Sequence, residues 1–578
     1  MKSFSLSRIP WATLGRQEAF SEISAKAEAQ KPRVRLMTRQ PLFTIVTQAT
    51  GVTSPLLESL LAQSYSFWEL IVVGSAPVHS DMRVRQTSAR GDSEGECFET
   101  GRRQAKGDWV GFLSPNEILS PAALFTFATE AERQPVRDVL YSHEVHLSTD
   151  YSHIDRFYSK GEYSWFNLIH FNCLGRGWFI RCSTLEKVNF EPEAFEADLF
   201  LKISEETENW GLIPSYLCYR RGVDPKSLER DGSHLFAVGS HIARRRYSGT
   251  AVVRGGRTLV TPLKEKSHLI SVIICFRNKA EWTIQCLRSL AGVHSRSPLQ
   301  VVLLNNRSDH EARARVKVEA VTLGLDFEFV DDAREFNFGQ MHNDAVARVA
   351  RGDILFFLNN DAFLDETVSL DDMVAWTAQD GIGVVGMALR YPDGRPQHTG
   401  FQATYGGENR MARVGHDHSQ NIFAGLRREV FGNTFAAAMM KRSVFETLGG
   451  LRAVEFPNGF GDVAFNFDCH RRGLHNLYLG DITGTHRESA SRGLSYEYWE
   501  EVAIETEYPD ILQKMLRADV GFDRIPRPDF SFRQLKEIFV AALYRTFPRL
   551  LALRPAIRRL IASSRPPLAL PSLTSTGE

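Results

Sequence analysis

Two aspartates and a histidine stand out because of the segments in which they lie. Asp361 falls in "GDILFFLNNDAFL" (352–364), directly after an apolar run typical of a buried strand. Asp462 lies in "FPNGFGDVAFNFDCHRRG" at the start of an expected helix, and His486 lies in "GTHRESASRG". A carboxylate and an imidazole can hold a divalent cation, and a second carboxylate can take a proton from an attacking hydroxyl. Taken singly, each has an ordinary interpretation as a turn acid, a helix cap or a loop histidine.

The segment around Asp361 has a counterpart earlier in the chain. "GDWVGFLSPNEIL" (107–119) has the same frame, but Ser114-Pro115-Asn116 stand where the later segment has Asn359-Asn360-Asp361. Upstream, "PLFTIVTQATG" and "LISVIICFRNK" each begin a strand, turn, helix, strand pattern with Val- and Ile-rich strands. The sequence therefore predicts an α/β fold with two doubly wound sheets in tandem, with ligands at the carboxyl ends of the strands.

The chain of 578 residues is long enough for two or three domains. We expect an N-terminal extension at 1–40, a first α/β domain at 41–225, a linker at 226–268, a second α/β domain at 269–505 and a helical, basic C-terminal region at 506–578.

Composition narrows the class of protein. The formal net charge is +0, which gives no general attraction to nucleic acid. The seven cysteines are scattered without a CxxC pair, as in reduced cytosolic proteins, and no apolar run approaches the length of a spanning helix. We therefore expect a cytoplasmic protein.

Several motifs of the second half occur together in the order of a known family. They are "SVIICFRN" (from Ser271), "NNRSD" (from Asn305), "FNFGQMHNDAV" (from Phe336), "FLNNDAFL" (from Phe357), "YPDGRPQHTG" (from Tyr391), "GHDH" (from Gly415), "FGDV" (from Phe460) and "HRESASRG" (from His486). This half resembles the family-2 glycosyltransferases of the GT-A fold, in particular the bacterial tandem enzymes that build O-antigen, capsule and similar polysaccharides.

The resemblance implies roles for individual residues. Asp361 and His486 would hold Mg2+ or Mn2+ on the diphosphate of a sugar-nucleotide donor, and Asp462 would be the catalytic base of an inverting transfer to a glycan acceptor. Donor-binding positions would be Asn278, Asn305, Asn337, Asn343, Asn359 and Asn360, and the acceptor side would include His416, His418 and Arg492. The acceptor of such enzymes is expected to be lipid-linked.

Some positions depart from the family pattern. Asn305 stands where the family usually has an aspartate that reads the nucleotide base, so the identity of the base stays open. Gly461 replaces the Glu or Asn that precedes the base. His416, Asp417 and His418 could form a metal cluster, but a loop on the acceptor side is the favoured interpretation because the family has a similar motif there.

The first half resembles the same family more loosely. Its turn lacks the metal-binding aspartate and continues with Glu117, and no histidine lies near "SYLCYRR" (from Ser215). Glu196 stands near the position of the base and Asp198 two residues on. We expect a degenerate domain kept for architecture or for gripping glycan. The alternative is a metal-independent domain that makes a second linkage.

Two other classes of protein remain as alternatives. A non-catalytic glycan-binding scaffold would not need Asp361, Asp462 and His486. A nucleotidyltransferase would have a Gly-rich N-terminal loop, which "SVIICFRNKAEW" lacks.

The C-terminal segment 531–565 combines two apolar helical faces with eight Lys and Arg residues against Glu537 alone. We weigh two interpretations equally: helices packed on the second domain, and a peripheral anchor on the anionic inner face of the plasma membrane.

Overall fold

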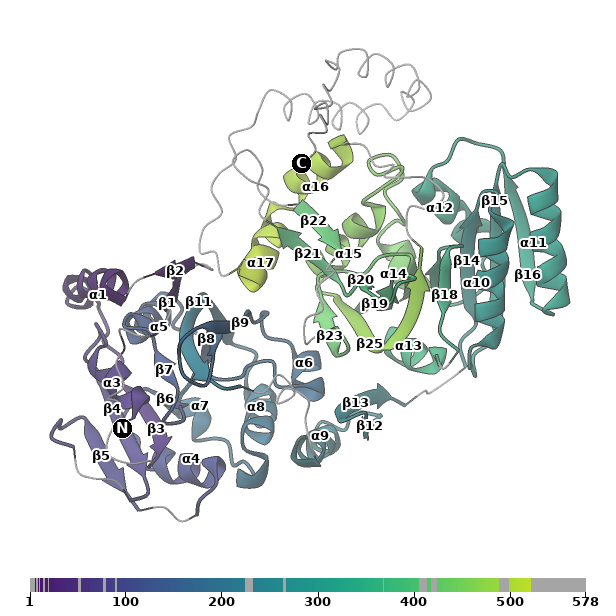
Figure 1. The fold of residues 1–578 in the computed structure, drawn as a ribbon. Helices are drawn as coiled ribbons and strands as arrows, with labels where there is room; N and C mark the ends of the chain where they lie inside the picture. The colour runs from purple at the N-terminus through teal and green to yellow at the C-terminus, as the bar shows by residue number, and fades with distance from the viewer. Residues whose placement is uncertain are drawn as a thin grey trace, which may run out of the picture.

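The structure is a computed structural model, and it describes residues 6, 9, 11–13, 16–18, 20–49, 54–75, 79–88, 91–223, 232–263, 267–366, 368–404, 413–416, 424–487 and 498–520. Two mixed α/β sheets dominate the described part, one in each half of the chain (Figure 1). We call them the first and second domains. Hairpin β1 (Trp11–Thr13) and β2 (Arg16–Glu18), with α1 (Phe20–Glu28) and α2 (Lys31–Val34), precedes the first.

The two sheets have the same strand order. The first runs β5 (Val84–Thr87), β4 (Trp68–Val73), β3 (Phe43–Gln48), β6 (Trp109–Phe112), β10 (Trp178–Arg181), β8 (Val139–Leu147), β11 (Trp210–Arg221) and β7 (Ile118–Leu119), with β9 (Ile154–Tyr158) beside β8. The second runs β16 (Phe327–Asp332), β15 (Leu299–Asn306), β14 (Ile270–Phe276), β17 (Ile354–Leu358), β24 (Ala437–Lys441), β19 (Ile382–Arg390), β25 (His475–His486) and β18 (Ala362–Leu364), with β20 (Pro396–His398) and β23 (Arg427–Val430) beside it. The predicted α/β tandem is therefore confirmed.

Helices cover the faces of both sheets, as near-continuous apolar strands require. The first domain has α3 (Pro55–Leu61), α4 (Glu94–Arg102), α5 (Ala123–Arg133), α6 (Trp165–His170), α7 (Cys182–Leu185) and α8 (Phe195–Glu206). The second has α10 (Ala280–Gly292), α11 (His310–Thr322), α12 (Phe338–Arg348), α13 (Leu370–Thr377), α14 (Arg442–Thr447) and α15 (Gly461–Arg471). Leu57 and Leu60 of α3 are buried, whereas Leu61, the last residue of α3, is 44% exposed.

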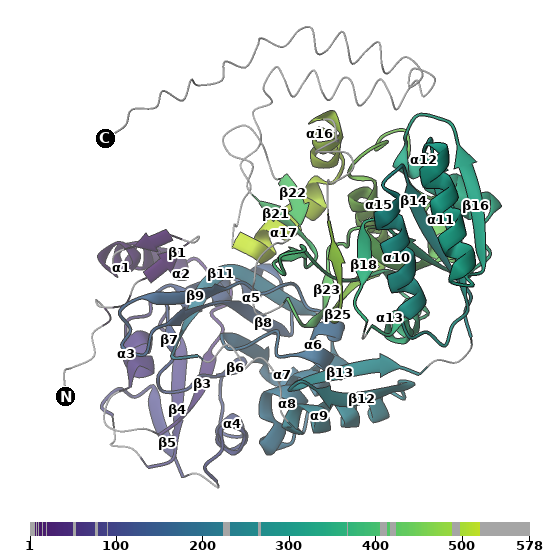
Figure 2. The same ribbon diagram turned by 45° about the vertical axis from the view of Figure 1, so that its right-hand side comes forward.

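The segment that we expected to be a linker is folded. It contains α9 (Gly232–Arg244) and a hairpin of β12 (Gly249–Arg254) and β13 (Arg257–Pro262), which lie between the two domains in both views (Figures 1 and 2). Val260 of β13 is fully buried, and its carbonyl accepts a hydrogen bond from Trp376 Nε1 of α13 at 3.2 Å. The hairpin is thus a packed layer rather than a spacer, because its apolar strand supplies core to both sides.

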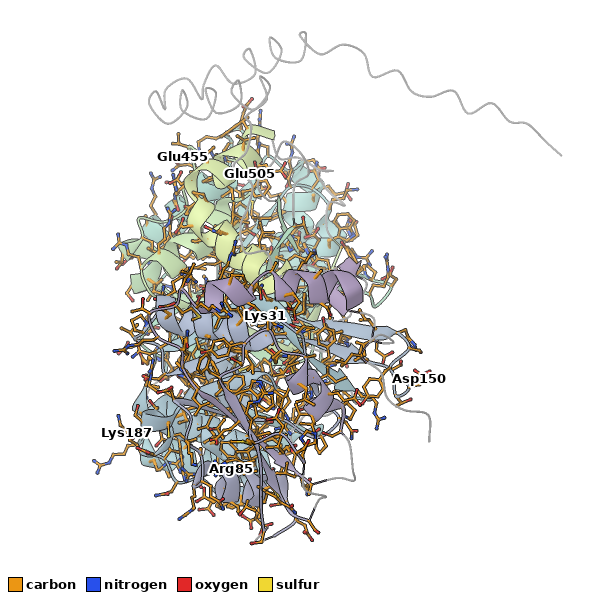
Figure 3. All side chains as sticks on the ribbon, turned by 90° about the vertical axis from the view of Figure 1, so that its left-hand side faces the viewer. Lys31, Arg85, Asp150, Lys187, Glu455 and Glu505 are labelled. Atoms are coloured by element: carbon orange, nitrogen blue, oxygen red, sulfur yellow. The ribbon has the colours of Figure 1, made fainter. Side chains whose placement is uncertain are left out.

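Two helices after the second sheet, α16 (Tyr498–Glu507) and α17 (Pro509–Val520), pack on that domain. Ile511, Leu512, Met515 and Leu516 are buried in one cluster with Phe467 of α15. In the view from the side of the first domain, Glu455 and Glu505 of the second domain lie near each other at the top, whereas Lys31, Arg85, Asp150 and Lys187 lie lower and outside the second domain (Figure 3). Within the described ranges, no helix combines the length and apolarity needed to cross a bilayer. The basic segment 531–565 lies outside the described residues.

Candidate functional site

Asp361 and His486 are brought together by strand pairing. The turn after β17 leads directly into β18, which runs antiparallel to the end of β25 with Ala362 opposite His486. Asp361 Oδ1 consequently lies 3.3 Å from His486 Nε2, with both side chains under 10% exposed. The backbone N–H of Arg487 also donates to the Asp361 carbonyl at 3.1 Å. A carboxylate oxygen and an imidazole nitrogen therefore face each other at the carboxyl end of the sheet.

Asp462 occupies the first turn of α15. Phe460, two residues before it, has a φ of +58°, a left-handed conformation that is strained for a bulky side chain. The Asp462 carboxylate accepts hydrogen bonds from Val463 N–H at 2.9 Å and Phe435 N–H at 3.3 Å. Burial raises the pKa of this carboxyl above its ordinary value, and the hydrogen bonds only partly oppose the rise. Such a group is a better proton acceptor than an exposed aspartate.

Both parts of the site meet at the residues before β24. Phe435 N–H bonds Asp462, and the carbonyl of the next residue, Ala436, accepts a hydrogen bond from Asn359 N–H at 2.9 Å. The turn that carries Asp361 and the helix that carries Asp462 therefore contact adjacent residues. The three residues selected from the sequence lie in one region.

Two residues that sequence reasoning missed hold the Asp462 turn. Asn466 Nδ2, one helical turn on, donates to the carbonyls of Asp462 and Asn433, both at 2.8 Å. The buried Glu500 of α16 accepts from the N–H groups of Asn458 and Gly459 at 2.9 and 3.1 Å. The spacing of Asn466 could have been noticed in the sequence, but no local pattern connects Glu500 to a loop some forty residues earlier.

His398, within the motif that begins at Tyr391, also lies here. Its Nε2 accepts from Thr434 N–H at 3.2 Å, and its Nδ1 is 2.8 Å from Nδ1 of His416. Burial holds the pKa of His398 well below its ordinary value, and His416 lowers it further. The ring is therefore neutral and serves as a fixed hydrogen-bonding group. His418, Asp417 and Arg492 lie outside the described residues.

Two of the asparagines expected on the donor side are used to hold helix α12. Asn343 exchanges two hydrogen bonds with the backbone of Leu451, both at 2.8 Å. Asn337 caps α12 by accepting from Gln340 N–H and donates to the Ala453 carbonyl at 2.9 Å. Their amides are satisfied by the protein, so the structure gives them a positioning role.

The remaining asparagines lie at strand ends. Asn278 Oδ1 accepts from Asp309 N–H at 2.9 Å and joins the loops after β14 and β15. Asn305 is buried and donates to Asp331 at 2.7 Å. Asn360 turns inward to Thr283 at 3.2 Å, whereas Asn359 Nδ2 lies 3.3 Å from His486 Nε2. The Asn359 side chain therefore directly contacts the Asp361–His486 pair.

The pair Asp361–His486 fits a divalent cation that takes its other ligands from a substrate. Within the described residues, no group of three or more His, Cys, Asp and Glu side chains is placed to hold a metal. Mg2+ and similar ions are commonly held by one or two protein ligands together with substrate phosphates and water. The donor set of one carboxylate and one imidazole is consistent with that arrangement.

At the matching position in the first domain, a glutamate and an arginine form an ion pair with each other. In the register of β7 and β11, Ile118 pairs with Tyr219, so Glu117 and Arg220 take the places of Ala362 and His486. Arg220 Nε lies 3.0 Å from Glu117 Oε1. An arginine is not a metal ligand, because its guanidinium stays protonated.

Arg176 completes this network. Its guanidinium is nearly buried and pairs with Glu196 at 2.7 Å, with Glu117 at 3.3 Å and with Glu94. Glu196 is the second residue of α8, as Asp462 is of α15. Burial alone would lower the pKa of Arg176, but the three carboxylates raise it above its ordinary range. The carboxylate at the base position is thus held by a cation.

Residues 271–449 match the family model described as Glycosyl transferase family 2. The second domain is therefore a family 2 glycosyltransferase domain, and the family that the motifs suggested is confirmed.

Named relatives extend over both domains. The chain is 26% identical over 515 residues to the O-antigen biosynthesis protein RfbC of Myxococcus xanthus, covering 81% of this chain and 39% of the relative. It is 25% identical over 512 residues to the uncharacterized protein y4gI of Sinorhizobium fredii (strain NBRC 101917 / NGR234), covering 80% and 54%. The chain thus spans about half, or less, of the length of these relatives. A solved structure of GalNAc-T7 with UDP, GalNAc and Mn2+ aligns with 13% identity and a TM-score of 0.34, covering 44% of this chain and 51% of that one.

Proposed function

We propose that the second domain transfers a sugar, with inversion, from a nucleotide-diphosphate donor to a hydroxyl of a cell-surface glycan. The observation that carries the proposal is the placement of Asp462 beside the strand end that bears Asp361 and His486, through the adjacent residues Phe435 and Ala436. Within the described residues no cation pairs with Asp462, and burial raises the pKa of its carboxyl, while Asp361 faces the His486 imidazole.

Asp462 is the proton acceptor in this proposal. An acceptor hydroxyl is a weak nucleophile, and a positioned carboxylate that removes its proton during attack is typically worth about 10²–10⁴ in rate. Phe435 and Val463 fix the carboxylate through their N–H groups. Attack on the face opposite the leaving diphosphate inverts the anomeric centre.

Asp361 and His486 would hold Mg2+ or Mn2+ against the donor diphosphate. A bound divalent cation neutralises the charge that develops on the leaving group. Asn359, which contacts His486, would help orient the imidazole. Asn278, Asn305, Asn337, Asn343 and Asn360 support the donor side indirectly, through the loops and helix that they hold.

The first domain is non-catalytic in this proposal. Its base-like residue Glu196 is paired with Arg176, and the histidine position is taken by Arg220. Burial alone would raise the pKa of nearby Glu144, but Lys160 and Arg220 hold it well below its ordinary range. Carboxylates that already pair with internal cations offer no free ligand to the metal ion of a metal diphosphate.

The acceptor is proposed to be a lipid-linked glycan of the O-antigen type. The support is the name of the Myxococcus xanthus relative and the basic segment 531–565, whose arginines and apolar faces suit an anionic cytoplasmic leaflet. Sedimentation with anionic liposomes tests the second point. Full-length protein should sediment at low salt and a chain ending near Pro528 should not; equal sedimentation would contradict a membrane role for the tail.

The function itself is tested by incubating the purified chain with a panel of sugar nucleotides and Mg2+ or Mn2+. Release of nucleoside diphosphate that requires an added glycan acceptor is the expected result. Pyrophosphate release would indicate a nucleotidyltransferase, and no release from any donor would favour a glycan-binding scaffold.

A further inference from the structure

Strand β23 stands between the first domain and the candidate site. Successive side chains of a strand point to opposite faces, and this strand uses both. Glu429 faces the first domain: its N–H donates to Asn167 Oδ1 at 2.8 Å, and its carboxylate accepts from Ser164 Oγ at 2.5 Å. Ser164 and Asn167 are the N-cap and an early residue of α6. Helix α6 therefore grips both the backbone and the side chain of one residue of β23.

Arg427 fixes the same strand to the interdomain hairpin. Its buried guanidinium pairs with Asp481 of β25 at 2.7 Å and donates to the Val260 carbonyl of β13 at 2.9 Å. Glu429 also accepts from His475 Nδ1 at 2.7 Å. The buried guanidinium of Arg427 allows the strand little movement, because any shift would leave its charge unpaired.

The other face of β23 supports a turn of the site. The Arg428 guanidinium donates to the Thr399 carbonyl. Gly400 has a φ of +112°, and a Cβ there would lie 3.0 Å from Val430 Cγ1. The turn 398–400 consequently packs directly on the strand, in a conformation that a larger residue would disturb.

From this turn the contacts lead to Asp462. His398 Nε2 accepts from Thr434 N–H at 3.2 Å, and the N–H of the next residue, Phe435, donates to the Asp462 carboxylate at 3.3 Å. Phe401 N–H donates to the Gly432 carbonyl at 2.9 Å, which ties the end of the turn to the same segment. A continuous set of contacts thus runs from α6 of the first domain to the group proposed as the base of the second.

We propose that the first domain is a positioning module for the site of the second domain: α6 sets β23, and β23 sets the turn 398–400 beside Asp462. Ser164, Asn167 and Glu429 are positioning residues, since none of them reaches the reacting groups. The inference rests on the proposed function for the identity of the reaction, but the physical coupling does not depend on it.

The coupling is tested by hydrogen exchange of the full-length chain. Asn167→Leu removes the acceptor for Glu429 N–H at nearly constant volume, and Glu429→Ala removes the acceptor for Ser164. In both variants we expect peptides covering 398–404 and 430–436 to exchange at least about tenfold faster, as a local opening does when a few contacts are lost. Asn209→Leu is the matched control: it makes the same substitution elsewhere in the first domain, at a residue bonded to Asp138. It should leave the hydrogen-exchange rates of these peptides unchanged.

Kinetics with the donor and acceptor that support turnover of the unmodified chain test the functional part. Turnover at saturating donor and acceptor should fall by about tenfold in Asn167→Leu, while the Michaelis constant for the donor stays within about twofold, because a small displacement of the groups beside Asp462 costs rate steeply. Glu429→Gln keeps an acceptor oxygen for Ser164, so it should retain most of the activity that Glu429→Ala loses.

The possible outcomes separate the two proposals. Unchanged exchange at 398–404 and 430–436 in both variants would overturn the positioning role, even if transfer is confirmed. An equal effect of Asn209→Leu would also overturn it, because the effect would then be general loosening. If the unmodified chain transfers no sugar, the proposed function fails, while the exchange experiment still decides whether the first domain positions the turn.

Discussion

At the equivalent strand ends of the two domains, the acidic side chains have different kinds of partner. In the second domain, Asp361 faces His486, and among the described residues Asp462 is held by hydrogen bonds and by no ion pair. In the first, Glu117 and Glu196 are matched by Arg220 and Arg176 from within the chain. A shared backbone frame therefore does not imply a shared site, because two arginines are enough to replace a ligand site with a self-contained ion network.

Among the described residues, non-glycine residues with positive φ are also more frequent in the second domain than in the first. The described residues include six non-glycine residues with positive φ, and four of them lie at strand ends or before Asp462 in the second domain: Asn278, Lys279, Arg307 and Phe460. The first domain contributes Tyr151, away from the helix that carries Glu196. Strain of this kind persists where surrounding structure enforces it and is common at functional sites.

The largest effect is expected from the base of the second domain. Asp462→Asn should lower turnover by about 10²–10⁴ while leaving donor binding intact, because only proton removal is lost. Product formation at saturating donor is the measurement. Asp468→Asn, in the same helix and bonded to the Tyr508 hydroxyl at 2.9 Å, is the matched control and should stay within a few-fold. Full turnover in Asp462→Asn would remove the functional contrast between the domains.

The next effect concerns the metal. Asp361→Ala and His486→Ala should each weaken Mn2+ binding in the presence of donor by about 10–100-fold, the range usual for lost metal-site interactions. Mn2+ titration followed by electron paramagnetic resonance reports this without any turnover. Asp365→Asn, whose carboxylate accepts from Thr483, serves as control. Unaltered Mn2+ affinity in both alanine variants would show that the ion is held elsewhere or is not used.

In the first domain the expected loss is stability rather than chemistry. Arg176→Met leaves Glu117 and Glu196 short of a partner, and breaking a buried ion pair in this way typically costs about 3–5 kcal/mol. In urea unfolding, the first domain should unfold at a lower urea concentration, with its free energy of unfolding reduced by that amount. Turnover of the folded protein should be nearly unchanged. Arg103→Met, at an exposed arginine paired with Glu99, should leave the transition in place. Loss of turnover without loss of stability would instead give Arg176 a catalytic role.

A smaller effect is expected in the pH dependence. Because burial raises the pKa of Asp462, kcat/KM should fall as pH decreases through a value above the ordinary aspartate pKa of about 3.9. The sign for stability is opposite: the protonated form is favoured by folding, so the contribution of Asp462 is lost as pH rises through its folded pKa. Asp462→Asn should therefore be at least as stable as the parent at pH 7. An acidic limb at or below the ordinary value would contradict the buried base.

The smallest effect is predicted for Glu196→Gln. Turnover should remain within a few-fold of the parent, because Glu196 is paired with Arg176. Linkage analysis of the product is the decisive measurement. If the variant lost one of two distinguishable linkages, the first domain would be an active, metal-independent transferase, and both domains would be catalytic.

Local sequence was a good guide wherever a residue's role depends on its strand or helix. The apolar runs before Asp361 and at 269–279 are parallel-sheet strands, and the repeated frame at 107–119 and 352–364 marks the same position in two sheets. Local sequence did not show which groups the asparagine side chains contact. Asn337 and Asn343 look like ligand-binding residues in the motif, but their amides bond the loop at 451–453, a hundred residues away along the chain.

By itself, the sequence determined the two-domain α/β fold, the family of the second domain and the candidate group Asp361, Asp462 and His486, because periodicity and short motifs act over a few residues. Only the tertiary structure decided which charges neutralise which. Arg176 meets Glu196, and β23 meets both α6 and the turn 398–400, through contacts between segments distant in sequence. Such pairings depend on the packing of whole domains, and no local pattern of residues encodes them.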